Sequence, residues 1–339
     1  MEHSEITIHD IAKILNIDSS TVSRALNNSP RVAQKTKDKI RAKANELGYQ
    51  RNHLASNLRK NKTYTLGVIV PRISRHFFSS AIAGIEETAF KHGYNVIICQ
   101  SLESLEREAS IINTLIANRV DGVLISISME TLNYDHLEGL SQRSIPYVFF
   151  DRHCNISGHS NVIIDDFDAA FKATEHLIKE NCKEIAHFSG PQELEIYRNR
   201  FKGYKAALHK HHLSFREELV ISSKLMEKDG RRNVDLMLST PYRVDGLFCA
   251  NDVVAIGAIK CLKQLGKKIP EEIAIVGFSN ETISSVIEPA LTTIHQSGSE
   301  IGIAAANLLM DKMSDNSIHK TITIDTDLIV RKSSLKAIK

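Results

Sequence analysis

The stretch Thr7-Ile8-His9-Asp10-Ile11-Ala12, with its continuation Ser20-Thr21-Val22-Ser23-Arg24-Ala25-Leu26-Asn27, predicts two short helices joined by a tight turn. Thr7 and Asp10 fit a capping box, in which two side chains satisfy backbone N–H groups that a first helical turn leaves free. Asn16 tolerates the left-handed conformation that such a turn needs, and Asp18 is placed to cap the second helix. Apolar residues at helical spacing predict one buried stripe: Ile8, Ile11, Ala12 and Leu15.

The outer face of the second helix is small, polar and rich in hydrogen-bonding groups. It carries Ser19, Ser20, Thr21, Ser23 and Arg24. A helix with such a face can enter the major groove of DNA and meet phosphates and base edges. Periodicity alone fits any small capped helical pair equally well, so the rest of the chain must decide between these interpretations.

The charge of the chain is unevenly distributed. Residues 1–63 contain 12 Lys and Arg against 6 Asp and Glu, a net charge of +6, while the whole chain has a net charge of only +3. The remaining residues are therefore mildly acidic, at −3. A small basic head on an acidic body favours binding of a polyanion by the head.

A third helix is predicted over residues 31–47, ending before Gly48. Basic side chains lie in or near it, and some of them should face phosphate: Lys35, Lys37, Lys39, Arg41 and Lys43. From Asn52 the chain could form two further helical turns, with Leu54 and Leu58 on one face. Such a short helix is marginal in water. It is either an ordinary linker or a hinge helix that orders on DNA and inserts Leu58 between base pairs in the minor groove.

Five fragments now occur in order along the chain: Thr-Ile-x-Asp-Ile-Ala, Thr-Val-Ser-Arg-x-Leu-Asn, Leu-Gly-Tyr, Asn-x-x-Ala-x-x-Leu-Arg and Leu-Gly-Val-Ile-Val-Pro. Each fragment is weak by itself, but the ordered set resembles the lactose/galactose repressor (LacI/GalR) family of bacterial transcription regulators. The likeness covers almost the whole chain. Two positions depart from the family pattern within the head and hinge: Asn16 replaces a turn glycine, and Arg51 replaces a proline before the hinge.

The resemblance implies a homodimer that binds double-stranded operator DNA, with each head reading one half-site. Ser19, Ser20 and Arg24 would then read bases. Phosphate contacts would come from Thr7, Thr21, Ser23 and Asn27, and they would fix register without specifying sequence. The hinge would contribute Asn52, His53, Leu54, Ala55 and Leu58.

From Thr65 the pattern changes to short apolar runs that alternate with helices, which indicates α/β lobes with parallel sheets. Strands are predicted at 66–70, 95–99, 122–126, 146–150, 185–189, 246–250 and 273–277, and helices at 77–92, 106–118, 169–181, 200–211 and 255–265. Arg119-Val120-Asp121-Gly122 and Arg243-Val244-Asp245-Gly246 each precede a strand, which hints at two similar lobes. The resemblance implies a periplasmic-binding-protein-like body of two doubly wound lobes, with crossings near residues 162, 293 and 325.

The predicted domains are therefore a helix-turn-helix head (1–49), a hinge and linker (50–63) and a two-lobed effector-binding and dimerisation body (64–339). The first lobe would comprise about 64–162 and 294–325, and the second about 163–293 and 326–339. Ligands bind such lobes in the crevice at the carboxyl ends of the strands. The candidates follow strands: Asp151-Arg152, Asn251-Asp252, Ser279-Asn280-Glu281 and, after the first strand, His76-Phe77-Phe78. Carboxylates, amides and an arginine for hydroxyl groups, with an aromatic ring for stacking, suit a sugar or nucleoside.

The family likeness assigns effector contacts to Phe77, Asp151, Arg200, Asn251 and Gln296. Ser279 stands where many members have an aspartate that binds sugar hydroxyls. Glu281 or Asp165 could replace that missing carboxylate.

Other function classes find little support. The chain has no Gly-x-Ser-x-Gly, Walker or His-Glu-x-x-His motif, so we expect no enzyme, metal or cofactor. The start, Met1-Glu2-His3-Ser4-Glu5, does not resemble a signal peptide, and the five scattered cysteines suit a reducing cytoplasm. We expect a cytoplasmic dimer with no membrane association, since no leucine heptad for a tetramer follows the last strand at Leu328-Ile329-Val330. The predicted function is a repressor whose operator affinity is set by a sugar or sugar derivative. The alternatives are a sugar-binding transport protein and a carbohydrate-processing α/β enzyme.

Overall fold

The computed structural model describes residues 6–49, 62–154 and 158–336, and the chain divides into two compact units, Met1–Thr63 and Tyr64–Lys339. The hinge residues predicted to contact DNA lie outside the described residues: Asn52, His53, Leu54, Ala55 and Leu58.

The head consists of three helices: α1 (Ile8–Leu15), α2 (Ser19–Leu26) and α3 (Gln34–Glu46). The predicted capping box forms: the Thr7 N–H donates to Asp10 Oδ2 at 2.8 Å, and the Asp10 N–H donates to Thr7 Oγ1 at 3.4 Å. Asn16 adopts the expected left-handed conformation, with φ at 51°. Asp18 occupies the N-cap of α2, but its side chain accepts no capping hydrogen bond, so that detail of the prediction is wrong.

The core of the head is small and contributed by all three helices. Ile11, Val22 and Ile40 are fully buried. Each large aliphatic side chain removed from water contributes roughly 1.5–3 kcal/mol. This core fixes the angle between α1 and α2 and thereby leaves the opposite face of α2 free.

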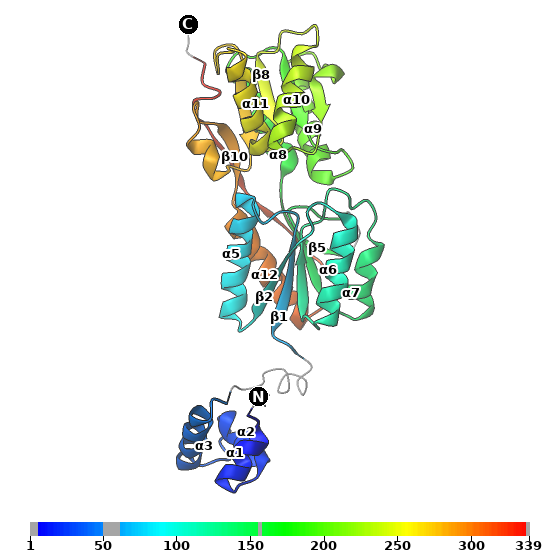
Figure 1. The fold of residues 1–339 in the computed structure, drawn as a ribbon. Coiled ribbons are helices and arrows are strands. Elements are labelled where there is room, and N and C mark those ends of the chain that lie inside the picture. The colour runs from blue at the N-terminus through cyan, green and yellow to red at the C-terminus, as the bar shows by residue number, and fades with distance from the viewer. Residues whose placement is uncertain (1–5, 50–61, 155–157, 337–339) are drawn as a thin grey trace. The chain divides into compact units, whose positions relative to one another are not determined.

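The first lobe of the body contains a six-stranded parallel sheet of order β11-β5-β4-β3-β1-β2. Helices α5 and α12 cover one face and α6 and α7 the other (Figure 1). Its elements are β1 (Thr65–Val70), α5 (His76–Lys91), β2 (Asn95–Gln100), α6 (Leu105–Ala117), β3 (Gly122–Ile125), η1 (Asp135–Leu137), α7 (Glu138–Gln142), β4 (Tyr147–Phe150), β5 (Ser160–Ile164), α12 (Gly298–Ser314) and β11 (Thr321–Ile324).

The second lobe contains a sheet of order β12-β10-β9-β8-β6-β7, in which only the β10–β12 pair is antiparallel among the described strands. Helices pack on it in the pairs α8–α9 and α10–α11. Its elements are α8 (Asp166–Lys179), β6 (Ile185–Ser189), α9 (Glu195–Lys210), η2 (Glu217–Leu219), β7 (Val220–Ser222), α10 (Glu227–Leu238), β8 (Gly246–Cys249), α11 (Asp252–Gln264), β9 (Ala274–Phe278), η3 (Thr282–Ser285), β10 (Thr292–Gln296) and β12 (Thr326–Ile329).

The chain passes between the lobes three times. β5 reaches Ile164 in the first sheet and β10 reaches Gln296 in the second, so the first two crossings lie slightly later than residues 162 and 293. The third crossing falls at Asp325, between β11 and β12. The predicted fold class, a helical head with two α/β lobes, is confirmed.

The repeated Arg-Val-Asp-Gly segments have the same role in both lobes. Asp121 Oδ2 accepts the Tyr64 N–H at 2.8 Å, just before β1. Asp245 Oδ1 accepts the N–H groups of Lys183 and Glu184 at 2.9 and 3.0 Å, just before β6. In each lobe the aspartate thus hydrogen-bonds the backbone at the start of the neighbouring parallel strand and stabilises it there. The short repeat reflects equivalent positions in two similar lobes.

Several elements differ from the prediction. Helix α9 begins at Glu195 rather than Arg200, so Arg200 lies within the helix instead of opening it. The sequence pattern also missed β5, α7, β7, α10, β10, α12 and β11. The β11 strand, Thr-Ile-Thr-Ile, alternates between exposed and half-buried residues but is only four residues long. Helix α12 carries alanines and leucines on most of its faces, which hides the helical period.

Candidate functional site

Side chains from the ends of several strands meet at one cavity between the lobes. All six predicted effector contacts line it: Phe77, Asp151, Arg200, Asn251, Ser279 and Gln296. The free volume is only about 60 Å³, well below the roughly 300–1,000 Å³ of most ligand pockets. Charged and aromatic side chains that pair with one another fill most of the space.

Arg200 is the most constrained of these side chains and is 3% exposed. Its Nε donates to Asp166 Oδ1 at 2.7 Å, and one terminal nitrogen donates to the Ala250 carbonyl at 2.7 Å. The guanidinium also stacks 3.6 Å from the centre of the Phe278 ring. Burial raises the pKa of Asp166 to about 6, against the opposing effect of Arg200. The second lobe therefore holds Arg200 in a fixed orientation.

A second arginine connects the two lobes. Arg152 donates to Glu103 Oε2 at 2.6 Å within the first lobe and to the Tyr197 hydroxyl of the second lobe at 3.3 Å. Burial tends to raise the pKa of Glu103, but Arg152 outweighs it and the pKa is lowered. The sequence did not single out Glu103 or Tyr197, because neither follows a strand directly.

Asp151 is 9% exposed and adopts a left-handed backbone with φ at 60°. Its Oδ2 accepts from the Ser126 hydroxyl at 3.4 Å. Burial raises the pKa of its carboxyl group, although Arg152 and Arg200 oppose this. A buried carboxyl group with one long hydrogen bond is well suited to accept a ligand hydroxyl.

Ser279 and Gln296 form a neutral pair on the second lobe. Gln296 Nε2 donates to the Ser279 hydroxyl at 2.9 Å, while Gln296 Oε1 is buried without a hydrogen-bond partner. Of the two carboxylates suggested as substitutes here, Glu281 lines the cavity. Asp165 instead caps α8 by accepting the Asp168 N–H at 2.9 Å. Only Glu281 is therefore placed to compensate for the missing aspartate.

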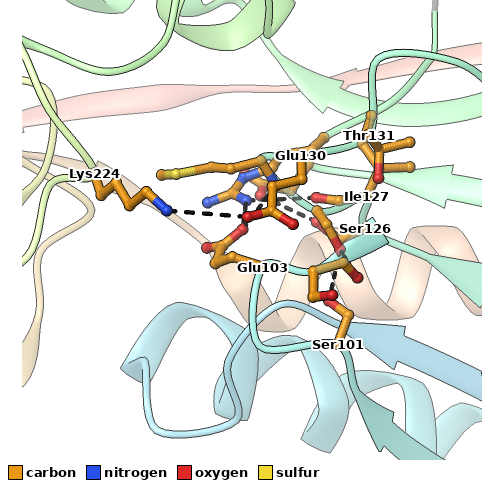
Figure 2. Close-up of polar contacts among 12 residues, drawn as sticks. Ser101, Glu103, Ser126, Ile127, Glu130, Thr131 and Lys224 are labelled. Atoms are coloured by element: carbon orange, nitrogen blue, oxygen red, sulfur yellow. Dashed lines mark hydrogen bonds and ion pairs between the residues drawn. The ribbon is translucent and has the colours of Figure 1, made fainter. Parts of the chain in front are cut away.

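Two further contacts connect side chains at the facing edges of the two lobes. Glu281 Oε2 accepts the His76 N–H at 3.1 Å. Lys224 of the second lobe extends toward Glu130 of the first, with 3.9 Å between the charged atoms (Figure 2). Lys224 is 79% exposed, so this pair contributes little to stability. The Lys224–Glu130 pair therefore adds little to the contact between the lobes.

His187 is fully buried on β6 of the second lobe, stacked on Phe248 at 4.7 Å between ring centres. Burial lowers its pKa to about 4, below the ordinary value near 6.5. The unfolded chain therefore binds the proton first as pH falls, and about 3 kcal/mol of stability is lost between pH 6.5 and 4.

We expect His187→Phe to reduce this loss of stability at low pH. Urea unfolding at pH 7 and 4.5 measures it, with exposed His209→Gln as the control; equal pH sensitivity of the wild type and His187→Phe would contradict the assignment.

The outer face of α2 is accessible in the head. Ser20, Arg24 and Asn27 are exposed, and Ser19, Thr21 and Ser23 are half-buried. Thr7 differs, because both its N–H and its hydroxyl donate to Asp10. A phosphate contact by Thr7 would have to replace those bonds.

The basic residues of α3 are not equivalent. Lys35, Lys39 and Arg41 are exposed. Lys37 is only 8% exposed, and its Nζ lies 3.4 Å from the Asn28 carbonyl. Lys37 therefore stabilises the turn after α2, and Lys35, Lys39 and Arg41 are the more accessible of the cations expected to face phosphate.

Within the described ranges, no group of three or more His, Cys, Asp or Glu side chains is arranged to hold a metal ion. None of the helices there is both long and apolar enough to cross a membrane.

Comparison with known proteins matches both units. Residues 7–52 match the model of bacterial regulatory proteins of the lacI family, and residues 63–332 match that of periplasmic binding proteins and the sugar-binding domain of the LacI family. The transcriptional repressor CytR of Escherichia coli K12 is 32% identical over 98% of this chain and 97% of its own length.

Two solved structures share the fold. A complex of the transcriptional regulator CelR with cellobiose is 25% identical, covers 97% of this chain and 100% of its own, and has a TM-score of 0.74. The lac repressor dimer bound to operator and the anti-inducer ONPF is 23% identical, covers 98% and 100%, and has a TM-score of 0.87. The predicted resemblance is confirmed: the chain belongs to the LacI family, whose members are helix-turn-helix transcriptional repressors with an effector-binding domain and are not enzymes.

Proposed function

We propose that this repressor binds operator DNA as a homodimer and that a sugar or nucleoside-like ligand between the lobes sets its operator affinity. One observation carries the ligand half of the proposal: six side chains from both lobes line a single cavity. The ligand would accept hydrogen bonds from Arg200 and Asn251, donate hydroxyl protons to Asp151, and pack on Phe77.

The small volume of the cavity implies that the structure must change before a ligand can bind. A sugar cannot fit into about 60 Å³, so the lobes must open or the Arg152–Glu103 pair must move before the ligand enters. The ligand then favours one arrangement of the lobes over the other. Coupling energies of about 1–3 kcal/mol are typical of such linked sites, and changes of this size in operator affinity can be measured readily.

In the DNA half of the proposal, α2 lies in the major groove, where Ser19, Ser20 and Arg24 contact bases. Thr21, Ser23 and Asn27 position the head on the phosphates. The six-residue excess of basic over acidic side chains in residues 1–63 supports this assignment. CelR with cellobiose and the lac repressor with operator are family structures with the corresponding partners.

A screen tests the ligand proposal directly. Thermal unfolding of the full chain is measured with a panel of sugars and nucleosides, and each compound that stabilises the protein is added to an operator-binding titration. We expect at least one stabilising compound to change operator affinity about fivefold or more. A panel in which stabilising compounds bind without altering DNA affinity would contradict ligand control of DNA binding.

Leu58→Ala tests the hinge. We expect it to weaken operator binding by at least about tenfold at fixed salt. The alanine side chain is too small to fill the space between the unstacked base pairs, so it offsets less of the free energy of unstacking. The free energy of unfolding should stay unchanged. Leu58→Ile, which keeps an apolar wedge of similar volume, serves as the control. Unchanged affinity of Leu58→Ala would remove the wedge role.

A further inference from the structure

A second, larger cavity of about 530 Å³ lies beside the inter-lobe cavity and shares Lys224 and Met226 with it. Arg72 contributes from the segment after β1 in the first lobe. Ser222 and Ser223 contribute from the end of β7, and Lys228 and Arg232 from α10. Unlike the inter-lobe cavity, this one has the volume of an ordinary ligand pocket.

The charge of this cavity is strongly positive. Four cations line it, Arg72, Lys224, Lys228 and Arg232, and we call them the basic rim. The single acid in the lining, Asp229, is engaged elsewhere, since its Oδ2 accepts the Met226 N–H at 2.9 Å. Across the described parts of the chain, no acidic group lies within ion-pair distance of three rim residues, Arg72, Lys228 and Arg232.

Two hydrogen-bonding groups in the lining also point to an anion. Arg72 Nε is buried and has no hydrogen-bond partner. An unpaired buried N–H costs about 1–3 kcal/mol, which an acceptor from a ligand would offset. The Ser223 hydroxyl oxygen accepts from Leu225 N–H at 3.3 Å and Asn233 Nδ2 at 3.2 Å. Its own hydrogen can therefore be donated to a further acceptor.

We infer that the basic rim binds the phosphate monoester group of an effector whose uncharged part lies in the adjoining inter-lobe cavity. This inference rests on the proposed ligand control and specifies the chemical class of the ligand. A phosphate monoester carries close to two negative charges and three acceptor oxygens at neutral pH. It thus matches several cations and a hydroxyl donor better than a carboxylate does, and guanidinium groups bind phosphate in a bidentate way.

The two lobes contribute unequally to the rim, and this gives phosphate a direct effect on lobe closure. Arg72 belongs to the first lobe, whereas Lys224, Lys228 and Arg232 belong to the second. Without an anion, closure brings Arg72 of the first lobe toward the cations of the second, and these like charges repel. Lys224 is offset by Glu130 of the first lobe at 3.9 Å, whereas Lys228 and Arg232 have no such ion pair within the described ranges. A bound phosphate neutralises that repulsion and contacts both sides, so it stabilises the closed arrangement specifically. A phosphorylated ligand should therefore control the repressor more strongly than the same compound without phosphate.

Inorganic phosphate is the first probe, used with the full chain at constant ionic strength. We expect it to raise the thermal unfolding temperature and to bind in a calorimetric titration. Lys228→Gln/Arg232→Gln should weaken phosphate binding at least tenfold, because each charge-assisted hydrogen bond contributes more than the 1.4 kcal/mol that a tenfold change represents. Both substituted residues are exposed, so this variant should fold normally. Arg72→Gln tests the contribution of the first lobe separately.

Arg231→Gln is the matched control. Arg231 is exposed on the same helix, and its replacement also removes a positive charge, but its terminal nitrogen donates to Gln264 at 3.3 Å, outside the basic rim. Phosphate affinity should be unchanged in this variant. Absence of phosphate binding to the wild type, or equal weakening in Arg231→Gln and Lys228→Gln/Arg232→Gln, overturns the inference.

Matched pairs then identify the source of the phosphate: ribose and ribose 5-phosphate, glucose and glucose 6-phosphate, adenosine and its monophosphate. We expect the phosphorylated member of the binding pair to be at least tenfold tighter, and Arg72→Gln to remove that gain. If unphosphorylated sugars alter operator affinity while phosphate does not bind, the inference fails and the proposed function stands. If phosphate binds at the rim but no compound of either form alters operator affinity, the proposed effector control fails.

Discussion

Replacing Arg200 by alanine is expected to abolish the effect of the ligand on operator affinity while leaving ligand-free DNA binding intact. It should also lower the free energy of unfolding by about 3–5 kcal/mol, the cost of removing one partner of a buried ion pair. The reason is the double role of this side chain: it lines the inter-lobe cavity and compensates Asp166 at 2.7 Å. Operator titrations with and without a stabilising compound give the first effect, and chemical unfolding gives the second.

The stability loss has a distinctive pH dependence. In the folded protein the pKa of Asp166 is already raised to about 6 by burial. Without Arg200 this carboxyl group holds its proton still more strongly, whereas an unfolded aspartate loses it near pH 4. The folded variant therefore binds more protons than the unfolded chain, and its stability rises as pH falls from about 7 toward 4. We expect a smaller difference from the wild type at pH 5 than at pH 7.5.

Arg200→Ala/Asp166→Ala is the control that separates the two roles. It removes the uncompensated carboxylate, so it should recover part of the lost stability but none of the ligand response. A ligand response that survives in Arg200→Ala would show that Arg200 is structural only. The same stability loss at both pH values would contradict the ion-pair explanation.

The head was predictable in detail because its signals are local. A capping box depends on two residues three positions apart, and Asn16 adopts the left-handed conformation because its short amide side chain tolerates it. The missing hydrogen bond of Asp18 shows the limit of such rules: the residue type favours the cap position, but the side chain has an alternative in water.

From the residue pattern alone, the candidate site was predictable where a strand directs a residue to it, whereas the family likeness supplied Phe77, Arg200 and Gln296. Asp151, Asn251 and Ser279 each follow a buried strand, and parallel strands end at the same edge of a sheet. Tyr197, Glu103 and Asp166 could not be found in this way. Tyr197 lies within a helix whose start the pattern placed too late, and the partners Glu103 and Asp166 are defined by contacts distant in sequence.

The basic rim was equally invisible in the sequence. Lys228 and Arg232 lie on α10, a helix with charged residues on most of its surface, and Arg72 lies far from them in the chain. Only the arrangement of the two lobes brings Arg72 to the cavity that Lys224, Lys228 and Arg232 of the second lobe line. The net charge of the body predicts no anion-binding site there, since the body as a whole is mildly acidic.

A chain that starts at Thr63 is expected to lose DNA binding completely while keeping ligand binding. Residues 1–63 hold the whole positive excess of the protein, and residues 64–339 have a net charge of −3. Specific operator affinity typically exceeds non-specific affinity by at least about 10³-fold, and loss of the head removes this specific part. The acidic body also lacks the positive charge on which non-specific binding to DNA phosphates depends. The full chain should be retained on heparin and on operator DNA in a strongly salt-dependent manner, and the shortened chain should pass through.

The shortened chain is a sound test because the body begins with its own anchor. Tyr64 N–H donates to Asp121 Oδ2 at 2.8 Å, and β1 then pairs in parallel with both β2 and β3. The body core therefore forms without the head, and thermal unfolding with and without a stabilising sugar checks this. If the shortened chain still bound operator with an unchanged salt dependence, the phosphate contacts would lie on the body, and the assignment of α2 as the DNA-reading helix would be wrong.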